Sequence, residues 1–507
     1  MAIQTAKSPL AASTKDGKKI KEQEKEAHAL GMTKKKSADF LEWYYEALQK
    51  ADVVDTRFKA KGFDVLMPTA MLVMEEMYKL LEGALRETGH MPLAFPVVIP
   101  ESEFKKEALH IKGFEEEVFW ITHAGKRKLD ERLVLRPTSE TAMYPLYSLW
   151  VRSHLQLPMK FYQAGRVYRY ETKMTRPLLR SREIFWLEAH DIQKTKEDSL
   201  KQVEEDMAIF KEVMTDTLCI PFLPLKRMEW DKFPGADSTY AFEAAMPDGK
   251  ILQIGTTHDL GQRFAKVFDI QFLDENGKKQ HAYQTCFGPG VSRTLGAMIG
   301  IHGDDKGLIL PPAVAPIQTV IVPIYTKESK AAVFAKCGEV LGWLAEKDFR
   351  VHFDSREQYT PGFKFHEWEL KGVPVRLEIG PRDIEGGIIS VVRRDFLERT
   401  TVPEEKLAEQ LLEIMDSITF QLHKRANEMM LIQGAENFSD LKSRLIKGGF
   451  IRIPFCLNEK CDEKLKADTG AEVRGTLFGD SSKPHAGAKC AICGKPARAM
   501  VYVAKAY

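Results

Sequence analysis

The residues with the most obvious capacity for chemistry lie between positions 169 and 190. Arg169 and Glu171 stand two apart on a predicted strand and therefore share one face. Arg180 and Arg182 follow a turn-like segment and could clamp phosphates bidentately. Alternating guanidinium groups, carboxylates and an aromatic ring suit a site that holds a polyphosphate, a purine and a small zwitterion. An ordinary antiparallel hairpin with a charged, solvated face explains the same residues equally well.

Two further segments could complete such a site. Thr138, Ser139 and Glu140 precede an apolar segment at 141–150, and this pattern first indicates a helix cap with a first-turn carboxylate. The functional alternative is that Thr138 and Glu140 fix an ammonium group. Around Gly288 and Gly290, small residues precede a helix that we expect to begin near Ser292, followed by Arg293. This arrangement allows close backbone approach to a phosphate, although two glycines in a turn are common.

Four of the seven cysteines form two close pairs near the end of the chain. Cys456 with Cys461 and Cys490 with Cys493 could supply the four thiolates of a structural Zn²⁺ site, which leaves no open position. Free thiols or a disulfide are the alternatives, and His485, between the pairs, could replace one cysteine. The three remaining cysteines are interpreted as packing residues: Cys219, Cys286 and Cys337.

Composition and charge narrow the class of protein. A chain of 507 residues predicts two to four domains. A net charge of +2 gives no overall attraction for a polyanion, so a polyanionic partner would have to bind at local basic patches. The sequence has no apolar run of roughly eighteen residues and no apolar core in its first forty positions, so neither a membrane span nor a signal peptide is expected. Few cysteines predict a reducing, cytoplasmic location. The Lys-rich segment 1–37 is interpreted as a flexible tail or as an arm that touches nucleic acid.

The order of predicted elements gives the fold class. Up to about residue 310 the pattern indicates an α+β block with a mostly antiparallel sheet. Three prolines in 311–316 predict a linker, because proline resists both helix and central strand. Beyond it, strands alternate with helices, as in a small α/β domain. A long helix at 403–431 leads to the cysteine-bearing segment.

Taken together and in order, these motifs resemble those of class II aminoacyl-tRNA synthetases, specifically prolyl-tRNA synthetases of the archaeal/eukaryotic type. The resemblance runs from about residue 38 to Tyr507. It implies a class II antiparallel-sheet catalytic domain at 38–313, an α/β anticodon-binding domain at 314–405 and a C-terminal zinc-containing α+β domain at 406–507. Pro96 resembles the family's first motif, which forms a homodimer interface. The family's C-terminus packs toward the catalytic domain, so we expect the same of Tyr507.

The resemblance also implies site residues. Arg169 and Arg293 would be catalytic. The implied proline-binding residues are Thr138, Glu140, Arg169, Trp186, Glu188 and His258. The implied ATP-binding residues are Arg169, Glu171, Arg180, Gln253, Thr256, Ser292 and Arg293, of which Gln253 and Thr256 resemble nucleotide and Mg²⁺ contacts. Ile184 stands where many class II enzymes have a phenylalanine that stacks on adenine, and the spacing from His190 to Gly288 leaves no room for the large editing insertion of bacterial-type enzymes.

The function implied is ATP-dependent attachment of proline to tRNA(Pro) through a prolyl-adenylate intermediate. Its substrates and partners would be proline, ATP with Mg²⁺, tRNA(Pro) and a second copy of the chain, with Zn²⁺ as a structural ion. Two alternatives stay open at this point. One is a synthetase-like tRNA-binding or regulatory protein without activity, and the other is a synthetase for another small amino acid.

Overall fold

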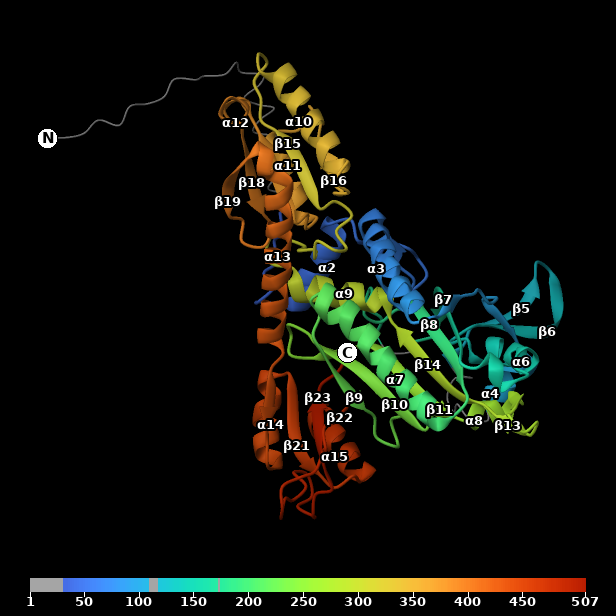
Figure 1. Ribbon diagram of the computed structural model, residues 1–507. Helices are drawn as coiled ribbons and strands as arrows, with labels where there is room; N and C mark the ends of the chain where they lie inside the picture. Colours follow the sequence, from blue (N-terminus) through green and yellow to red (C-terminus); the bar gives the residue numbers. More distant parts are fainter. Residues whose placement is uncertain (1–30, 109–116, 172–173) are drawn as a thin grey trace. The chain divides into compact units, whose positions relative to one another are not determined.

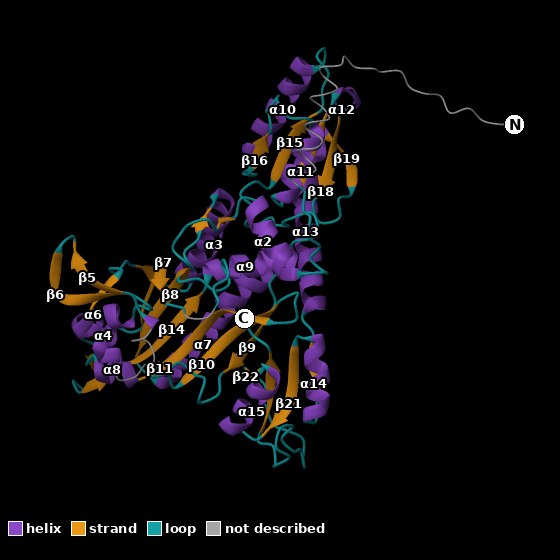
Figure 2. Cartoon of the chain, turned by 180° about the vertical axis from the view of Figure 1, so that it is seen from behind, coloured by secondary structure: helices purple, strands orange, loops and turns teal. Residues whose placement is uncertain are grey.

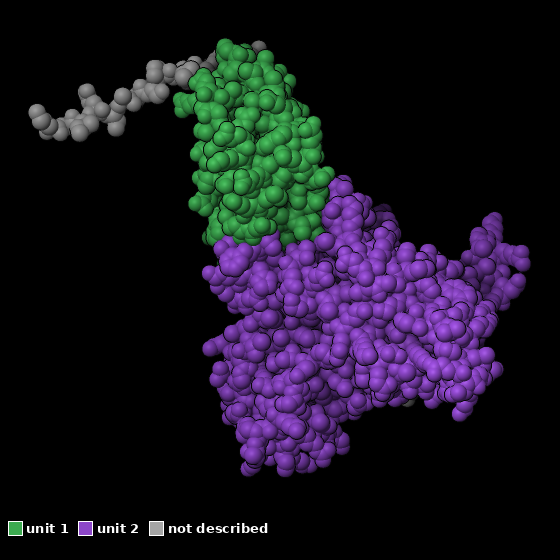
Figure 3. All heavy atoms as spheres, viewed as in Figure 1, with its two compact units in different colours: residues 1–52, 303–418 green, residues 53–302, 419–507 purple. Residues whose placement is uncertain are grey.

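The computed structural model describes residues 31–108, 117–171 and 174–507 (Figure 1). The chain forms two compact units (Figure 3). One unit contains 303–418 together with the segment that ends at Asp52, and the other contains 53–302 together with 419–507. The predicted domain boundaries are not the boundaries of these units, and they stay a prediction. Residues 1–30 of the predicted tail lie outside the described residues, whereas Thr33 and Lys34 donate main-chain hydrogen bonds to Glu46.

An eleven-stranded sheet is the framework of the second unit (Figure 2). Its strand order is β20-β21-β23-β22-β9-β10-β11-β14-β8-β7-β3, and each pairing is antiparallel except β20·β21 and β3·β7. The expected mostly antiparallel sheet is therefore confirmed. The strands are β3 (Met91–Pro92), β7 (Met159–Tyr168), β8 (Glu183–Gln193), β9 (Phe222–Lys226), β10 (Ser238–Ala245), β11 (Ile251–Gly261), β14 (Tyr283–Pro289), β20 (Ile432–Gly434), β21 (Phe450–Phe455), β22 (Glu472–Leu477) and β23 (Ala499–Ala504).

Helices pack against this sheet through apolar stripes. In α3 (Pro68–Glu87) proline occupies the first turn, where its missing N–H costs nothing, and Met74, Met77, Leu81 and Leu85 are fully buried. This buried stripe packs α3 into the core of the unit. The other helices of this unit are α4 (Glu101–Ala108), α6 (Glu140–Trp150), η1 (His154–Gln156), α7 (Lys196–Lys211), η2 (Glu212–Thr217), α8 (Arg263–Val267), α9 (Val291–His302), α14 (Phe438–Lys447) and α15 (Glu459–Thr469).

Smaller sheets complete the second unit. Strand β6 (Arg127–Leu135) lies between β4 (Val98–Pro100) and β5 (Trp120–Ala124) in a three-stranded antiparallel sheet. Two short ribbons pair β1 (Val54–Asp55) with β2 (Val65–Leu66), and β12 (Gln271–Leu273) with β13 (Lys279–His281).

The hairpin between β7 and β8 corrects one prediction. Tyr168 ends β7, so Arg169 and Glu171 do not lie on a strand and do not share a strand face. The reason is local hydrogen bonding: the Glu171 main-chain N–H donates to the Arg169 carbonyl at 2.8 Å, which turns the chain out of the ladder. The loop that follows brings Arg180 back toward the start of β8.

The first unit has the predicted alternation of strands and helices. Its five-stranded sheet has the order β16-β15-β17-β18-β19, with β15 parallel to both neighbours and the remaining pairs antiparallel. The elements are α2 (Phe40–Lys50), β15 (Thr319–Pro323), α10 (Lys330–Ala345), β16 (Val351–Phe353), α11 (Pro361–Leu370), β17 (Val375–Ile379), α12 (Pro381–Gly386), β18 (Ile388–Arg393), β19 (Arg399–Pro403) and η3 (Glu404–Lys406). Helix α13 (Leu407–Met429) carries the chain from this unit into the other.

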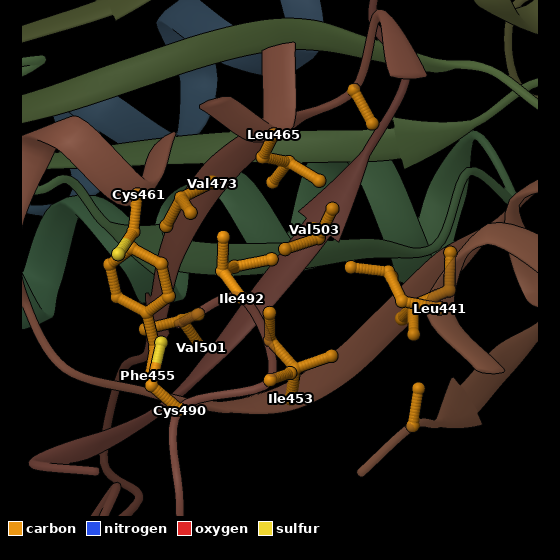
Figure 4. Close-up of a cluster of buried hydrophobic side chains, with 14 of the residues drawn as sticks. Leu441, Ile453, Phe455, Cys461, Leu465, Val473, Cys490, Ile492, Val501 and Val503 are labelled. Atoms are coloured by element: carbon orange, nitrogen blue, oxygen red, sulfur yellow. The ribbon is translucent and has the colours of Figure 1, made fainter. Parts of the chain in front are cut away.

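A separate apolar core stabilises the C-terminal strands of the second unit (Figure 4). Ile453, Val473, Val501 and Leu441 are buried there, together with the predicted zinc ligands Cys461 and Cys490. The cysteine cluster therefore packs against a buried apolar core. In the described part of the chain, no helix is long and apolar enough to cross a membrane.

Candidate active site

A cavity of about 540 Å³ opens in the second unit, beside the central strands β8, β11 and β14. It brings together residues that are far apart in the sequence. The predicted site residues that line it are Thr138, Glu140, Arg169, Arg180, Trp186, Glu188, Gln253, Thr256, His258 and Arg293. Two predicted residues do not line it: Glu171 ion-pairs with Arg180 at 3.8 Å, and the buried Ser292 hydroxyl donates to the Phe185 carbonyl at 3.3 Å.

Two buried carboxylates mark one end of the cavity. The Thr138 hydroxyl donates to the Glu140 carboxylate, and the Ser139 hydroxyl donates to Glu188. Gln163 Nε2 donates to Glu188 Oε1 at 2.7 Å. Ser139 stands at the start of α6 but makes no side-chain cap, so the capping interpretation of this segment is wrong for Ser139. Its hydroxyl instead orients a carboxylate.

His190 lies behind this end and keeps Glu188 ionised. His190 Nε2 lies 3.2 Å from Glu188 Oε2, and Nδ1 lies 3.0 Å from the Tyr144 hydroxyl. Burial alone would raise the pKa of Glu188, but the hydrogen bond and charge of His190 outweigh it and lower that pKa. Burial opposes protonation of His190 as well, yet the contact with Glu188 raises the pKa of His190. Glu188 is therefore held as a carboxylate in spite of its burial.

His258 forms a neutral wall of the cavity. Its ring packs at 4.9 Å on Phe233, and Nδ1 lies 3.0 Å from the Thr239 hydroxyl. Burial, reinforced by the positive charges of His190 and Arg169, lowers the pKa of His258 to about 3. The imidazole is uncharged near neutral pH and can border a cation without repelling it.

Arg169 and Trp186 meet near the middle of the cavity. The Arg169 guanidinium lies 5.4 Å from the Trp186 ring centroid, and its Nε donates to the Pro137 carbonyl at 3.0 Å. Trp186 Nε1 is buried and has no hydrogen-bond partner among the described residues. A buried donor of this kind needs an acceptor, which a bound ligand can supply.

Several guanidinium groups line the same cavity. Burial and the nearby charges of Arg169 and Arg180 lower the pKa of Arg293 to about 10. Three guanidinium groups that share one cavity repel each other, and a polyanion relieves that repulsion. The arrangement is therefore built for a ligand with several negative charges.

The start of α9 is fixed by a close backbone approach. The Gly290 main-chain N–H donates to the Ile254 carbonyl at 2.9 Å, and a side chain at position 290 would place its Cβ 3.2 Å from that oxygen. Arg293 follows one turn later and donates from Nη1 to the Gln253 carbonyl at 3.0 Å. The glycines at 288 and 290 thus position a guanidinium against β11.

The neighbouring side chains of Ile184 and Phe185 have different surroundings. Ile184 lines the cavity, as expected from its position in the motif. Phe185 stacks on Arg166 with the guanidinium 4.3 Å from the ring centroid. An aliphatic side chain therefore replaces the expected aromatic one as a cavity surface.

Several cavity residues escaped prediction. Cys286 was interpreted as a packing residue, yet it lines the cavity with its sulfur 3.8 Å from Glu140 Oε1. Its position two residues before Gly288 on the same strand was the available signal. Arg227, Glu472 and Arg474 also line the cavity, and nothing in their local sequence indicated it. As expected, Tyr507 packs toward the region predicted as the catalytic domain: Arg180 Nη2 donates to the Tyr507 carbonyl at 2.7 Å.

The four predicted zinc ligands come together in the C-terminal region. The ligand atoms of Cys456, Cys461, Cys490 and Cys493 all lie within 4.8 Å of one another. The sulfur of Cys456 lies 3.5 Å from that of Cys461 and 3.8 Å from that of Cys493. Sulfurs around a tetrahedral zinc ion are about 3.8 Å apart, because Zn–S bonds are about 2.3 Å long. The donor set and its spacing fit Zn²⁺, and His485 is not in the group found among the described residues.

Comparison with known proteins identifies the class of this fold and site. Residues 119–302 match the family described as tRNA synthetase class II core domain (G, H, P, S and T), and 318–414 match the anticodon binding domain. The chain therefore belongs to the class II aminoacyl-tRNA synthetases. Residues 438–507 match the C-terminal domain of prolyl-tRNA synthetase. The expected three-part fold class is confirmed.

Individual relatives narrow the assignment. Proline–tRNA ligase of Thermofilum pendens is 50% identical over 94% of this chain and 99% of its own length. The corresponding protein of Pyrococcus abyssi is 45% identical with the same coverage. The crystal structure of prolyl-tRNA synthetase from Cryptosporidium parvum, complexed with halofuginone and AMPPNP, matches with a TM-score of 0.88 at 32% identity, covering 94% of this chain and 97% of that chain. This chain belongs to the prolyl-tRNA synthetase family.

The depressed pKa of His258 gives a testable titration. A histidine whose folded pKa lies far below 6.5 stays neutral in the folded protein, so folding stability should fall as the pH drops below about 6.5. In isotope-labelled protein, the His258 ring signal, assigned by comparison with His258→Gln, should show no titration between about pH 8 and pH 5. A midpoint near 6.5 for that signal would contradict the neutral wall.

Proposed function

We propose that this protein attaches proline to tRNA(Pro) in two steps that use ATP. The observation that carries the proposal is one cavity lined both by the carboxylates of Glu140 and Glu188 and by the guanidiniums of Arg169, Arg180 and Arg293. A zwitterionic amino acid placed with its ammonium group at the carboxylates directs its own carboxylate toward the guanidiniums. Membership of the prolyl-tRNA synthetase family supports proline as that amino acid.

The first step joins proline to the α-phosphate of ATP. A carboxylate oxygen of proline attacks the α-phosphorus, and pyrophosphate leaves with the electrons of the broken P–O bond. Arg169 contacts both the attacking carboxylate and the α-phosphate, and it stabilises the charge that develops between them. Arg180 and Arg293 hold the departing phosphates. Class II synthetases generally use Mg²⁺ with ATP, and the ion neutralises phosphate charge.

The second step transfers the prolyl group. A hydroxyl of the 3′-terminal adenosine of tRNA(Pro) attacks the activated carbonyl carbon, and AMP leaves. The described cavity residues position the adenylate, and no side chain forms a covalent bond. The proposed activity places the protein where tRNA is charged, in the cytoplasm.

The proline end combines polar anchors with an apolar wall. Thr138, Glu140 and Glu188 accept or orient the secondary ammonium group. Trp186 and His258 enclose its ring. A pocket of this kind rejects larger side chains by overlap but discriminates weakly against smaller ones, since one missing methylene is worth about 1–3 kcal/mol. Alanine and cysteine are therefore the competitors to measure.

Proline-dependent exchange of pyrophosphate into ATP separates the proposal from its two alternatives. Exchange with proline supports the proposed activity. Exchange that favours alanine or cysteine would support a synthetase for another small amino acid. Absence of exchange with every amino acid would support a tRNA-binding protein without activity.

Replacing Arg169 tests the central role. Arg169→Ala should lower the exchange rate by about a hundredfold to a thousandfold, as the loss of a donor to developing charge does elsewhere. Arg166→Ala is the matched control, because Arg166 ion-pairs with Glu183 at 3.0 Å and does not line the cavity. Near-normal exchange in Arg169→Ala would refute the assignment.

We also propose that the four C-terminal cysteines bind one structural Zn²⁺. Four thiolates at tetrahedral spacing leave no coordination position for a substrate, and Cys461 and Cys490 are part of the buried C-terminal core. The ion would join the segment that holds Cys456 and Cys461 to the segment that holds Cys490 and Cys493.

Metal content and unfolding temperature test this site. Cys456→Ser should lose most of the expected one zinc per chain by elemental analysis and should unfold at a lower temperature, because ligand loss weakens the metal-linked folding energy. Cys337→Ser, which alters a buried cysteine of the other unit, should keep its zinc. Equal zinc content in Cys456→Ser and the unmodified protein would contradict the proposal.

Finally, we propose that the protein is a homodimer. Exposed apolar side chains gather where β3 forms an edge of the long sheet: Met91 is 61% exposed, and Leu149 on α6 is 58% exposed. Trp150, also partly exposed, packs on Phe95 beside Pro96. Apolar surface at a sheet edge favours burial against a second molecule, and Pro96 belongs to the segment that resembles the family's dimer motif.

Light scattering coupled to size exclusion measures the dimer directly. The unmodified protein should have twice the mass of one chain, and Leu149→Glu should shift the population toward monomers because a buried carboxylate is costly. Ile446→Glu, at a position 87% exposed on α14, should remain dimeric. A monomeric unmodified protein at micromolar concentration would overturn the proposal.

A further inference from the structure

The C-terminal region reaches the cavity through a chain of buried charges. Arg474 on β22 donates from Nη2 to Glu243 Oε1 at 2.6 Å, and Arg227 donates from Nη2 to the same oxygen at 2.5 Å. Arg227 Nη2 also donates to Gln253 Oε1 at 2.7 Å. Arg474 and Arg227 are each 7% exposed, and Glu243 is fully buried. The contacts therefore run from the C-terminal strand to a residue on the cavity wall.

Backbone geometry places Arg474 at the start of this series of contacts. Strand β22 pairs with β9 through Thr476 and Lys226, and the β22·β23 register shifts between Val473 and Gly475. Gly475 has φ +136°, and a side chain there would put its Cβ against the Lys226 carbonyl oxygen. An irregularity of this type re-aims the neighbouring side chain. Arg474 is thereby directed toward Glu243 on β10.

The contact with Arg227 decides which end of the Gln253 amide faces the cavity. A guanidinium only donates hydrogen bonds, so the atom of Gln253 that it contacts is the amide oxygen. The main chain of Gln253 is held from the other side, where its carbonyl accepts from Arg293. Gln253 lines the cavity, and its NH₂ group is what remains to be offered to a ligand.

We propose that Arg474, Glu243 and Arg227 are positioning residues for the nucleotide, which orient Gln253 as a hydrogen-bond donor to an oxygen or ring nitrogen of ATP. The C-terminal region is then part of the nucleotide site. This inference rests on the proposed use of ATP.

The electrostatics of the three residues explain why each is needed. Burial would raise the pKa of Glu243, but the charges of Arg474 and Arg227 outweigh it, so the carboxylate stays ionised. Glu243 Oε2 has no hydrogen-bond partner in the described part of the chain. Without Arg474, the remaining guanidinium that hydrogen-bonds Glu243 would be Arg227, which also holds the Gln253 amide.

Kinetics and calorimetry on the full-length protein test the proposal. Arg474→Met should raise KM for ATP in the exchange reaction, and the Kd of Mg·ATP, by about tenfold, which corresponds to the loss of about one charged hydrogen bond. KM for proline should change less than about twofold. Arg474→Lys, which keeps a charge and a donor, should recover most of the ATP affinity. Arg452→Met is the control, because Arg452 pairs with Asp480 elsewhere in the same region.

A second variant tests the role of Gln253 directly, even if Arg474→Met does not fold. Gln253→Glu can keep the contact with Arg227 but replaces the NH₂ donor with a carboxylate oxygen, so it should weaken ATP binding. An unchanged Kd for Mg·ATP in Gln253→Glu, or in a folded Arg474→Met, would overturn the inference. If the unmodified protein shows no exchange with any amino acid, the proposed function fails, while calorimetry with Mg·ATP still decides the positioning role.

Discussion

The main-chain pairing of β22 with β9 is the constraint on which the site depends. It continues the catalytic sheet into the C-terminal strands, so both regions form one hydrogen-bonded layer. Strand pairing fixes side-chain direction residue by residue, because a slip by one position sends each side chain to the opposite face. The placement of Arg474 and the approach of Tyr507 to Arg180 follow from this continuity.

Charge balance is the second organising feature. Five of the described arginines line the cavity, and the charges of Arg169 and Arg180 lower the pKa of Arg293, so a bound polyanion is favoured because it reduces this repulsion. The carboxylates of Glu140 and Glu188 line the same cavity and can bind a cation. His258 also lines it and is uncharged near neutral pH. The protein is thus complementary to a zwitterion and a polyphosphate placed side by side.

Candidate site residues could be predicted from the sequence where they belong to short motifs. Thr138, Arg169 and Trp186 were identified from short segments, and the structure collects them in one cavity. The cysteine cluster was predicted from spacing alone, and the four sulfurs do converge. Errors arose where local pattern competed with tertiary contacts. Ser139 has the sequence of a helix cap, but its hydroxyl is used to orient Glu188.

Cys286 shows a different kind of failure. Its position two residues before Gly288 was the available signal, but only the pairing of β14 with β8 and β11 places Cys286 beside Glu140. The prediction for Glu171 failed for a local reason. Its expected strand position is absent because a main-chain hydrogen bond turns the chain after Arg169. Periodicity reports the faces of regular strands and says nothing of side chains beyond their ends.

The sequence by itself determined the family, the alternation of elements and most of the residues that carry charge into the cavity. These properties are local, since they depend on residue type, spacing and hydrophobic period. Only the tertiary structure decided that Arg474 and Arg227 meet at Glu243 and which end of the Gln253 amide faces the cavity. Such contacts depend on strand register and on a bulge at Gly475, and register is set by pairing between segments that are distant in the chain.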